Sequence, residues 1–187
     1  MVVRCPWPGE DALMQRYHDE EWGVPVRDDR RWMEYIILDA FQAGLSWRTV
    51  LHKRQAFRAA FHDFDPLRVA RMTESEIEAA RQNPGIIRNH LKIKAAVKNA
   101  ALFVALAEKH GSFDRFIWSF TDGRVVRNRW KRPEEIPAAT PLSDKVSKTL
   151  KQAGFSFVGS TICYAFLQAG GIVNDHLVSC FRYNELK

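Results

Sequence analysis

The sequence predicts an all-α protein on three observations. Apolar residues recur at helical spacing along most of the chain, capping residues separate these stretches, and no strand-like alternation persists. The 187 residues are 46% hydrophobic and 27% charged, which is typical of a globular chain that can bury a core. We treat residues 1–187 as a single domain, with room for two lobes around a shared cleft.

Short helices separated by capping residues are expected in the N-terminal half. The first runs from Asp11 to about Trp22, and Asp28 or Asp29 can cap the second. The stretch from Ser46 to Phe61 has the apolar spacing of one amphipathic helix. Further helices are predicted from a proline start, a capping box and the longest helical pattern, at Asp65-Pro66, Thr73-Glu74-Ser75-Glu76 and residues 88–109.

The C-terminal half begins with a change of composition. Residues 121–142 are rich in Arg, Pro and Thr and predict a long surface loop. Ser143-Asp144 is expected to cap the next helix, which ends at Ala153-Gly154. A tight connection then leads to a second helix that runs to about Ala169, so the pair spans about residues 143–169.

Composition also limits where the protein works and what it binds. No apolar run is long enough to span a bilayer, so no membrane association is expected, and the N-terminus lacks the features of a secretion signal. Three cysteines cannot all pair within the chain, which favours the reducing cytoplasm. The formal charge of +6 mildly favours an anionic partner.

A carboxylate and a tryptophan flank a glycine corner. Asp39 lies inside an apolar helical run, Gly44 breaks that run, and Ser46 can cap a new helix that begins at Trp47. A carboxylate among apolar side chains is costly unless it is paired or used. The corner can therefore aim Asp39 and Trp47 into one cavity, although an acid on a polar edge beside a core tryptophan fits the same residues.

Three other aromatic residues of the N-terminal third, Trp7, Tyr17 and Trp22, are candidates for the lining of that cavity. Flat π faces suit a nucleobase, and a positively charged base gains cation–π energy as well. Packing in the core is the alternative for each of them, as it is for most tryptophans.

The helix pair over about 143–169 has the features of an anion site. Its second helix follows Gly154 and Gly159 and begins with Ser160 and Thr161, so its first backbone N–H groups are available to a phosphate oxygen. This arrangement resembles a helix-hairpin-helix, which grips the DNA backbone without reading bases. An ordinary helical corner beside a solvated lysine face is the alternative.

Four residues near the two termini can form a metal site. His176 and Cys180, four apart, are expected on one face of a helix, and Cys5 and His18 complete a Cys₂His₂ set. Four protein ligands would make a structural zinc site that ties the termini together. The alternative is two buried cysteines and two incidental histidines, because neither half has CxxC spacing. Cys163, in mid-helix, is assigned to the core.

Motifs along nearly the whole chain resemble the Tag family of 3-methyladenine DNA glycosylases, within the helix-hairpin-helix glycosylases. The resemblance rests on several stretches that are specific in combination: Arg4-Cys5-x-Trp7, Tyr17-His18-Asp19-x-Glu21-Trp22-Gly23-Val24-Pro25, Gln42-Ala43-Gly44-Leu45-Ser46-Trp47, Phe61-His62-x-Phe64-Asp65-Pro66, Gly85-Ile86-Ile87-Arg88, Trp118-Ser119-Phe120, Gly154-Phe155-x-Phe157-Val158-Gly159-x-Thr161-Ile162-Cys163-Tyr164 and Val173-Asn174-Asp175-His176. The arginine-rich stretch around 121–133 is not matched.

The resemblance implies a helix-hairpin-helix glycosylase fold, two helical lobes around a base-binding cleft, and one structural Zn²⁺. The zinc ligands carried over are Cys5, His18, His176 and Cys180, and the base stacks on Trp47 in a pocket shared with Tyr17, Trp7 and Trp22. Two positions depart from the family: the pocket acid is Asp39 where relatives have Glu, and Met14 stands where an aromatic residue is common.

The function that the resemblance implies is hydrolysis of the N-glycosidic bond of 3-methyladenine in alkylated double-stranded DNA, by a monomer that leaves an abasic site. Ser160-Thr161 occupy the place of the lysine of bifunctional relatives, which predicts a monofunctional enzyme. Asp175 is a secondary catalytic candidate or a helix cap, and Leu45 is the residue we expect to fill the vacated base stack. The alternative function is a noncatalytic, zinc-containing module that binds DNA or damage.

Overall fold

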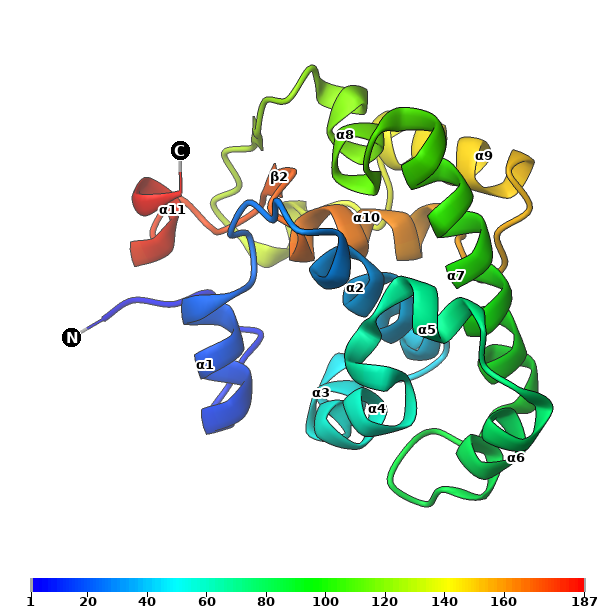
Figure 1. The fold of residues 1–187 in the computed structure, drawn as a ribbon. Helices are drawn as coiled ribbons and strands as arrows, with labels where there is room; N and C mark the ends of the chain where they lie inside the picture. Colours follow the sequence, from blue (N-terminus) through cyan, green and yellow to red (C-terminus); the bar gives the residue numbers. More distant parts are fainter. Residues whose placement is uncertain (1, 187) are drawn as a thin grey trace.

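The computed structural model describes residues 2–186 and is built almost entirely from helices (Figure 1). The α-helices are α1 (Ala12–Glu20), α2 (Asp29–Gln42), α3 (Trp47–His52), α4 (Arg54–Ala60), α5 (Pro66–Ala70), α6 (Glu74–Gln82), α7 (His90–His110), α8 (Phe113–Trp118), α9 (Pro141–Gln152), α10 (Ser160–Ala169) and α11 (Phe181–Glu185). Short 3₁₀ turns occur at η1 (His62–Phe64), η2 (Ser119–Thr121) and η3 (Pro133–Glu135). The all-α prediction is confirmed.

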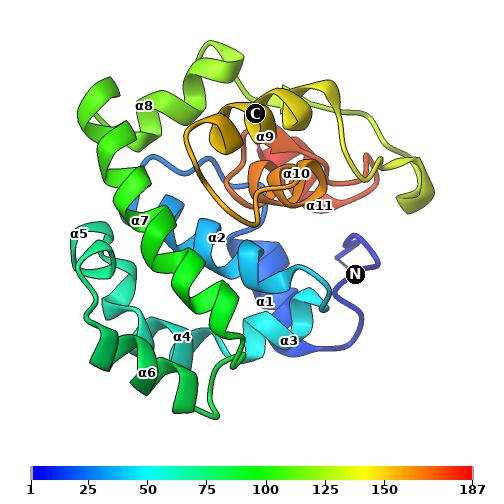
Figure 2. The same ribbon diagram turned by 90° about the vertical axis from the view of Figure 1, so that its right-hand side faces the viewer.

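Helix α2 forms the centre of the fold. Residues from Trp32 to Phe41 are buried on every side of the helix, and α2 packs against α3, α7, α8 and α10. Figure 2 shows α3, α4 and α6 below α2 and α8–α11 above it, with α7 running beside both groups. Gly170, just after α10, permits the close approach to α2, because a Cβ there would lie 2.0 Å from the Trp32 ring. The site-bearing segments therefore meet around a fully packed helix.

The residues that begin several helices were predicted correctly from the sequence. Asp11 and Asp28 cap α1 and α2, Pro66 occupies the first turn of α5, and Thr73 forms a capping box with Glu76 at α6. The caps act through hydrogen bonds between residues at most three positions apart, and Pro66 acts through its fixed φ, so sequence alone suffices to place these signals.

Three local predictions were wrong. The stretch from Ser46 to Phe61 is two helices, α3 and α4, which meet at Lys53, where the backbone leaves α geometry (φ −96°, ψ 0°). Helix α9 begins at Pro141 and is capped by Thr140, whereas Ser143 completes the capping box. Residues 176–180 form turns, not a helix, and Cys180 instead precedes α11.

The two ends of the chain lie together. The Phe181 N–H donates to the Val3 carbonyl at 2.9 Å, and Figure 1 shows both termini on the same side as α11. Residues 121–140 form the predicted long connection, fixed to the C-terminal part by a two-residue parallel pairing of β1 (Val126–Arg127) with β2 (Val173–Asn174). Within residues 2–186, no helix is both long and apolar enough for a membrane crossing.

Candidate functional site

A cavity of about 390 Å³ opens between α1, α2, α3, α10 and the η3 turn, within the range of small-molecule sites, about 300–1,000 Å³. Its lining is mostly aromatic and apolar, with one carboxylate and two amides: Trp7, Tyr17, Trp22, Asp39, Gln42, Trp47, Pro133, Ile136, Ala165, Gln168 and Ala169. All five cavity residues predicted from the sequence lie in this lining. The structure thus favours a shared cavity over separate core and edge positions.

Asp39 is the carboxylate of this cavity, and it lies on the buried face of α2. The residue is 3% exposed, and its Oδ2 atom has no hydrogen-bond partner within residues 2–186. Burial raises the pKa of Asp39 well above its usual range. A carboxylate in this state carries a desolvation cost that a cationic, hydrogen-bonding ligand would relieve.

The corner after α2 places Trp47 in the same cavity as this acid. Gly44 adopts φ +80°, where a side chain would be strained, and Ser46 caps α3 through the Thr49 N–H. The buried Lys92 ammonium donates to the carbonyls of Phe41 and Ala43, at 2.9 and 2.6 Å. These bonds satisfy the carbonyls that end α2, so the corner is held from inside the protein.

The aromatic side chains form two contacting pairs around the cavity. The ring centroids of Trp7 and Trp22 are 5.2 Å apart, and those of Tyr17 and Trp47 are 5.1 Å apart. Burial raises the pKa of Tyr17 well above its usual range, so its hydroxyl stays protonated. The buried Trp47 Nε1 has no hydrogen-bond partner among the described residues. The cavity thus offers π faces and protonated donors beside a carboxylate.

Sequence reasoning gave no role to several lining residues. Gln42 lies three positions after Asp39, and that helical spacing was the available signal for their shared face. Gln168 is held by a hydrogen bond from its Nε2 to Asp175, which directs its amide. Pro133 and Ile136 come from the long connection, and no local pattern relates them to a cavity 90 residues earlier in the chain. Met14 is buried but is not among the lining residues.

Four ligand atoms, one from each of Cys5, His18, His176 and Cys180, lie within 4.8 Å of one another. All four residues are buried, and Cys180 Sγ is 3.5 Å from both His18 Nε2 and His176 Nδ1. Contacts with Cys5 and then with the two histidines hold the pKa of the Cys180 thiol well below its usual range. This group can bind a metal ion, although His176 and Cys180 are brought together by turns and not by a helix.

The outer nitrogens of both histidines are also held. His18 Nδ1 is 2.8 Å from an Asp19 carboxylate oxygen, and His176 Nε2 is 3.0 Å from the Trp22 carbonyl. Such contacts orient metal-binding imidazoles. Because Trp22 also lines the cavity, the cysteine–histidine cluster supports one aromatic wall of the site.

Asp175 is a buried acceptor of four hydrogen bonds and does not line the cavity. It accepts from Asn128 and Trp130 at 2.7 Å, from Gln168 at 2.8 Å, and from the Tyr164 hydroxyl. Its carboxylate is therefore fully used in joining the long connection to α10. It does not cap a helix, and its candidacy as a catalytic residue stays a prediction.

Helices α9 and α10 are joined by residues 153–159, with Gly154 in the left-handed region (φ +98°). Gly159 precedes α10, which has no side-chain cap, and the space where its Cβ would lie is open. The Ser160 hydroxyl contacts Ser143 at 2.8 Å, and Thr161 is exposed. The N-terminus of α10 is therefore accessible, as the predicted phosphate contact requires.

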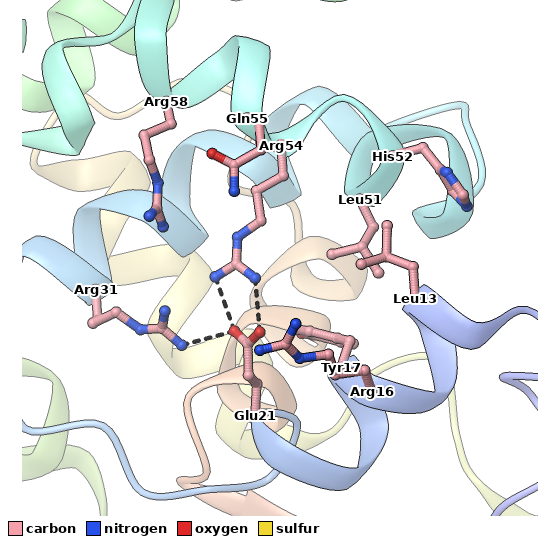
Figure 3. Close-up of a pocket in the computed structure, with 10 residues that line it drawn as sticks. All are labelled: Leu13, Arg16, Tyr17, Glu21, Arg31, Leu51, His52, Arg54, Gln55 and Arg58. Carbon is pink, nitrogen blue, oxygen red and sulfur yellow. Dashed lines mark hydrogen bonds and ion pairs between the residues drawn. The ribbon is translucent and has the colours of Figure 1, made fainter.

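A second cavity of about 350 Å³ lies on the other side of Tyr17, which borders both (Figure 3). Figure 3 shows Arg54 and Arg31 directed at the carboxylate of Glu21, each with a hydrogen bond of 2.8 Å. Arg54 also donates to the buried Glu34 at 2.6 Å. Arg58 adds a third guanidinium, 3.2 Å from Glu34, so both acids are paired and we assign the network to holding α1 against α2 and α4.

The Glu21 network predicts an acid-sensitive contribution to stability. Burial opposes ionisation of Glu21, but hydrogen bonds from Arg54 and Arg31 outweigh it and lower the pKa. The stabilisation is therefore present above the unfolded-state pKa of 4.5 and is lost as the pH falls through the lower folded-state value. Urea unfolding between pH 3 and 7 should show a shallower acid limb for Glu21→Gln; an unchanged limb would contradict this assignment.

Comparison with known proteins shows which family has this arrangement. The profile of the family described as "Methyladenine glycosylase" matches residues 7–183. The DNA-3-methyladenine glycosylase of Haemophilus influenzae is 46% identical over 96% of this chain and 97% of its own length. DNA-3-methyladenine glycosylase 1 of Escherichia coli is 47% identical over 97% of each chain.

A solved structure agrees with these sequence relatives. It is a structure of the 3-methyladenine DNA glycosylase I of Staphylococcus aureus that addresses 3-methyladenine recognition. It superposes on this chain with a TM-score of 0.92 at 32% sequence identity and covers 95% of both chains. From the family profile and these relatives, we conclude that the chain belongs to the methyladenine glycosylase family.

Proposed function

We propose that the protein is a DNA glycosylase that hydrolyses the N-glycosidic bond of 3-methyladenine in alkylated double-stranded DNA. The observation that carries this proposal is the buried Asp39 carboxylate, which has no partner within residues 2–186 and faces an aromatic cavity. The names of the relatives support the same substrate class.

The mechanism follows from the charge of the substrate. An N3-alkylated adenine in DNA is cationic, and the charge already weakens its bond to deoxyribose. Asp39 accepts hydrogen bonds from the base and favours the cationic form, while Trp47 stacks on its face. Neutral adenine lacks the charge interaction that offsets the desolvation of Asp39. Water then attacks the anomeric carbon through an oxocarbenium-like transition state.

The reaction should end at an abasic site. A lyase step needs an amine nucleophile at the sugar, and no lysine lines the cavity within the described part of the chain. Ser160 and Thr161 follow Gly159 at the start of α10, where their backbone N–H groups suit a phosphate oxygen. We therefore propose a monofunctional enzyme in which the α9–α10 pair serves as a helix-hairpin-helix DNA contact.

Zinc is the metal that fits the buried cluster best. Two thiols and two imidazoles form a soft set typical of tetrahedral structural zinc, and each histidine presents one nitrogen to the cluster while its other nitrogen is held. The ion would be closed off by four protein ligands and would supply no reacting water. Its role would be to hold residues 5–22 against 176–180.

Base release from methylated duplex DNA tests the proposal. The protein should release free 3-methyladenine and leave uncut strands, and Trp47→Ala should weaken recognition about 5- to 150-fold, the equivalent of about 1–3 kcal/mol of stacking. Trp47→Phe keeps an aromatic face and should lose less. A folded wild-type protein that binds methylated DNA without releasing base would instead support the noncatalytic binding module.

A further inference from the structure

The long connection before α9 carries a run of positive charge. Five cations and no acid occur between Asp122 and Glu134: Arg124, Arg127, Arg129, Lys131 and Arg132. All five are exposed. In Figure 2 this yellow-green segment projects at the right-hand edge of the molecule, above the N-terminal segment.

The middle of this connection is fixed. Asn128 and Trp130 each donate a side-chain hydrogen bond of 2.7 Å to the buried Asp175, and the Trp130 carbonyl accepts from the Val178 N–H at 2.9 Å. The Trp130 ring also packs against the cluster of Cys5, Leu177 and Cys180. These contacts fix the backbone of the segment. We call the connection from Arg124 to Ile136 the strap.

The strap is also part of the cavity wall. Pro133 and Ile136 line the same cavity as Asp39 and Trp47. Trp130 is partly buried against Cys5, Leu177 and Cys180, whereas its neighbours Arg129 and Lys131 are exposed. They lie within four residues of Pro133, so these two cations are held close to the cavity.

Three of these five cations have no side-chain partner within residues 2–186, namely Arg124, Arg129 and Lys131, and of the three Arg124 borders a different cavity, with Phe120 and Pro141. Arg127 donates to the Tyr183 carbonyl, and Arg132 is paired with Glu135 at 3.0 Å. The side chains of Arg129 and Lys131 make neither a hydrogen bond nor an ion pair anywhere in residues 2–186. Two unpaired cations on a braced segment are available to an anion at little ordering cost.

We propose that Arg129 and Lys131 bind phosphate groups of the duplex next to the flipped nucleotide. The strap is thus a DNA-backbone contact separate from the N-terminus of α10. This inference rests on the proposed function, because it places DNA over the cavity. Contacts to phosphate fix position and are independent of base sequence, so the strap would hold the sugar–phosphate backbone at the cavity without selecting a sequence.

The test is the salt dependence of binding to a duplex that contains a stable abasic-site analogue. Each phosphate contact contributes about 0.9 to the slope of log K against log salt concentration. The double variant Arg129→Ala/Lys131→Ala should therefore flatten the slope by about 1–2. Arg129→Lys/Lys131→Arg keeps both charges and should retain the slope. Arg71→Ala/Lys109→Ala removes the same charge from exposed positions just after α5 and on α7 and serves as the matched control.

The outcomes separate the two proposals. If Arg129→Ala/Lys131→Ala has the wild-type slope, or flattens it no more than the Arg71→Ala/Lys109→Ala control does, the strap is not a phosphate contact. Release of 3-methyladenine by the wild-type protein is measured in parallel. A flattened slope together with absent base release would leave the strap as a DNA contact and overturn the glycosylase activity instead. Thermal unfolding of each variant verifies that the fold is intact.

Discussion

Asp39→Asn should make the protein more stable and nearly inactive. The substitution replaces a buried carboxylate, which has no partner within residues 2–186, with a neutral side chain of similar shape. An unsatisfied buried charged group costs at least about 1–3 kcal/mol, and removing the charge should return a free energy of unfolding of that order at neutral pH. Loss of the group that opposes the charge of the base should slow release by about 10²–10³-fold.

The stability gain should depend on pH in a defined direction. The folded-state pKa of Asp39 is raised above its ordinary value of 3.8 by burial. Below pH 3.8 the Asp39 carboxyl is protonated in both the folded and the unfolded state, so its burial then costs the wild-type protein least. The free energy of unfolding falls as the pH rises from 3.8 toward the folded-state pKa. Urea unfolding should thus show little difference between Asp39→Asn and wild type near pH 3.5 and a growing difference above it.

Asp39→Glu is the control that keeps the charge. It restores the acid that the resembled family carries at this position, so it should keep both base release and the pH-dependent stability penalty. If Asp39→Asn released 3-methyladenine at the wild-type rate, Asp39 would not be the group that recognises the base. If its stability relative to wild type were independent of pH, the pKa of Asp39 would not be raised in the folded protein.

The parts of the site that sequence could predict are those set by local geometry. Asp39 and Trp47 were placed around Gly44 because helix breaking and Ser46 capping act over a few residues. Trp7, Tyr17 and Trp22 were candidates for the cavity as aromatic residues, with the core as the alternative, and the resemblance favoured the cavity. They line it together. A burial cost at Asp39 was foreseeable from its apolar neighbours in the sequence.

Tertiary packing accounts for what sequence missed. Lys92 caps the end of α2 from 50 residues downstream, and Pro133 and Ile136 reach the cavity only because Asp175 braces their segment. The amphipathic pattern continues across Lys53, where α3 ends and α4 begins. Periodicity alone therefore shows no boundary between the two helices. Spacing of four between His176 and Cys180 fits a helix turn, but a turn that packs against residues near Cys5 satisfies it equally well.

Loss of the cysteine–histidine cluster should have the largest effect on stability. The folded protein should contain one zinc per chain, and Cys180→Ser should abolish stoichiometric binding. In isolated zinc fingers the bound ion contributes about 10–16 kcal/mol, which sets an upper limit here because α2 and its neighbours form a core of their own. Each kcal/mol corresponds to about 2–4 °C in a chain of this size, so we expect Tm to fall by about 10 °C or more.

The segments in which hydrogen exchange increases distinguish loss of a metal that joins the termini from ordinary disruption of the core. Cys163→Ser is the matched control, because Cys163 is equally buried but its thiol donates to the Val158 carbonyl and is not part of the cluster. Chelation and Cys180→Ser should both increase hydrogen exchange in residues 3–9 and 176–181, whose contacts depend on the cluster, while α7 remains protected. Cys163→Ser should keep its zinc and leave the ends of the chain protected. Folded wild-type protein without metal by elemental analysis, or the same exchange pattern in Cys163→Ser, would show that packing alone joins the termini.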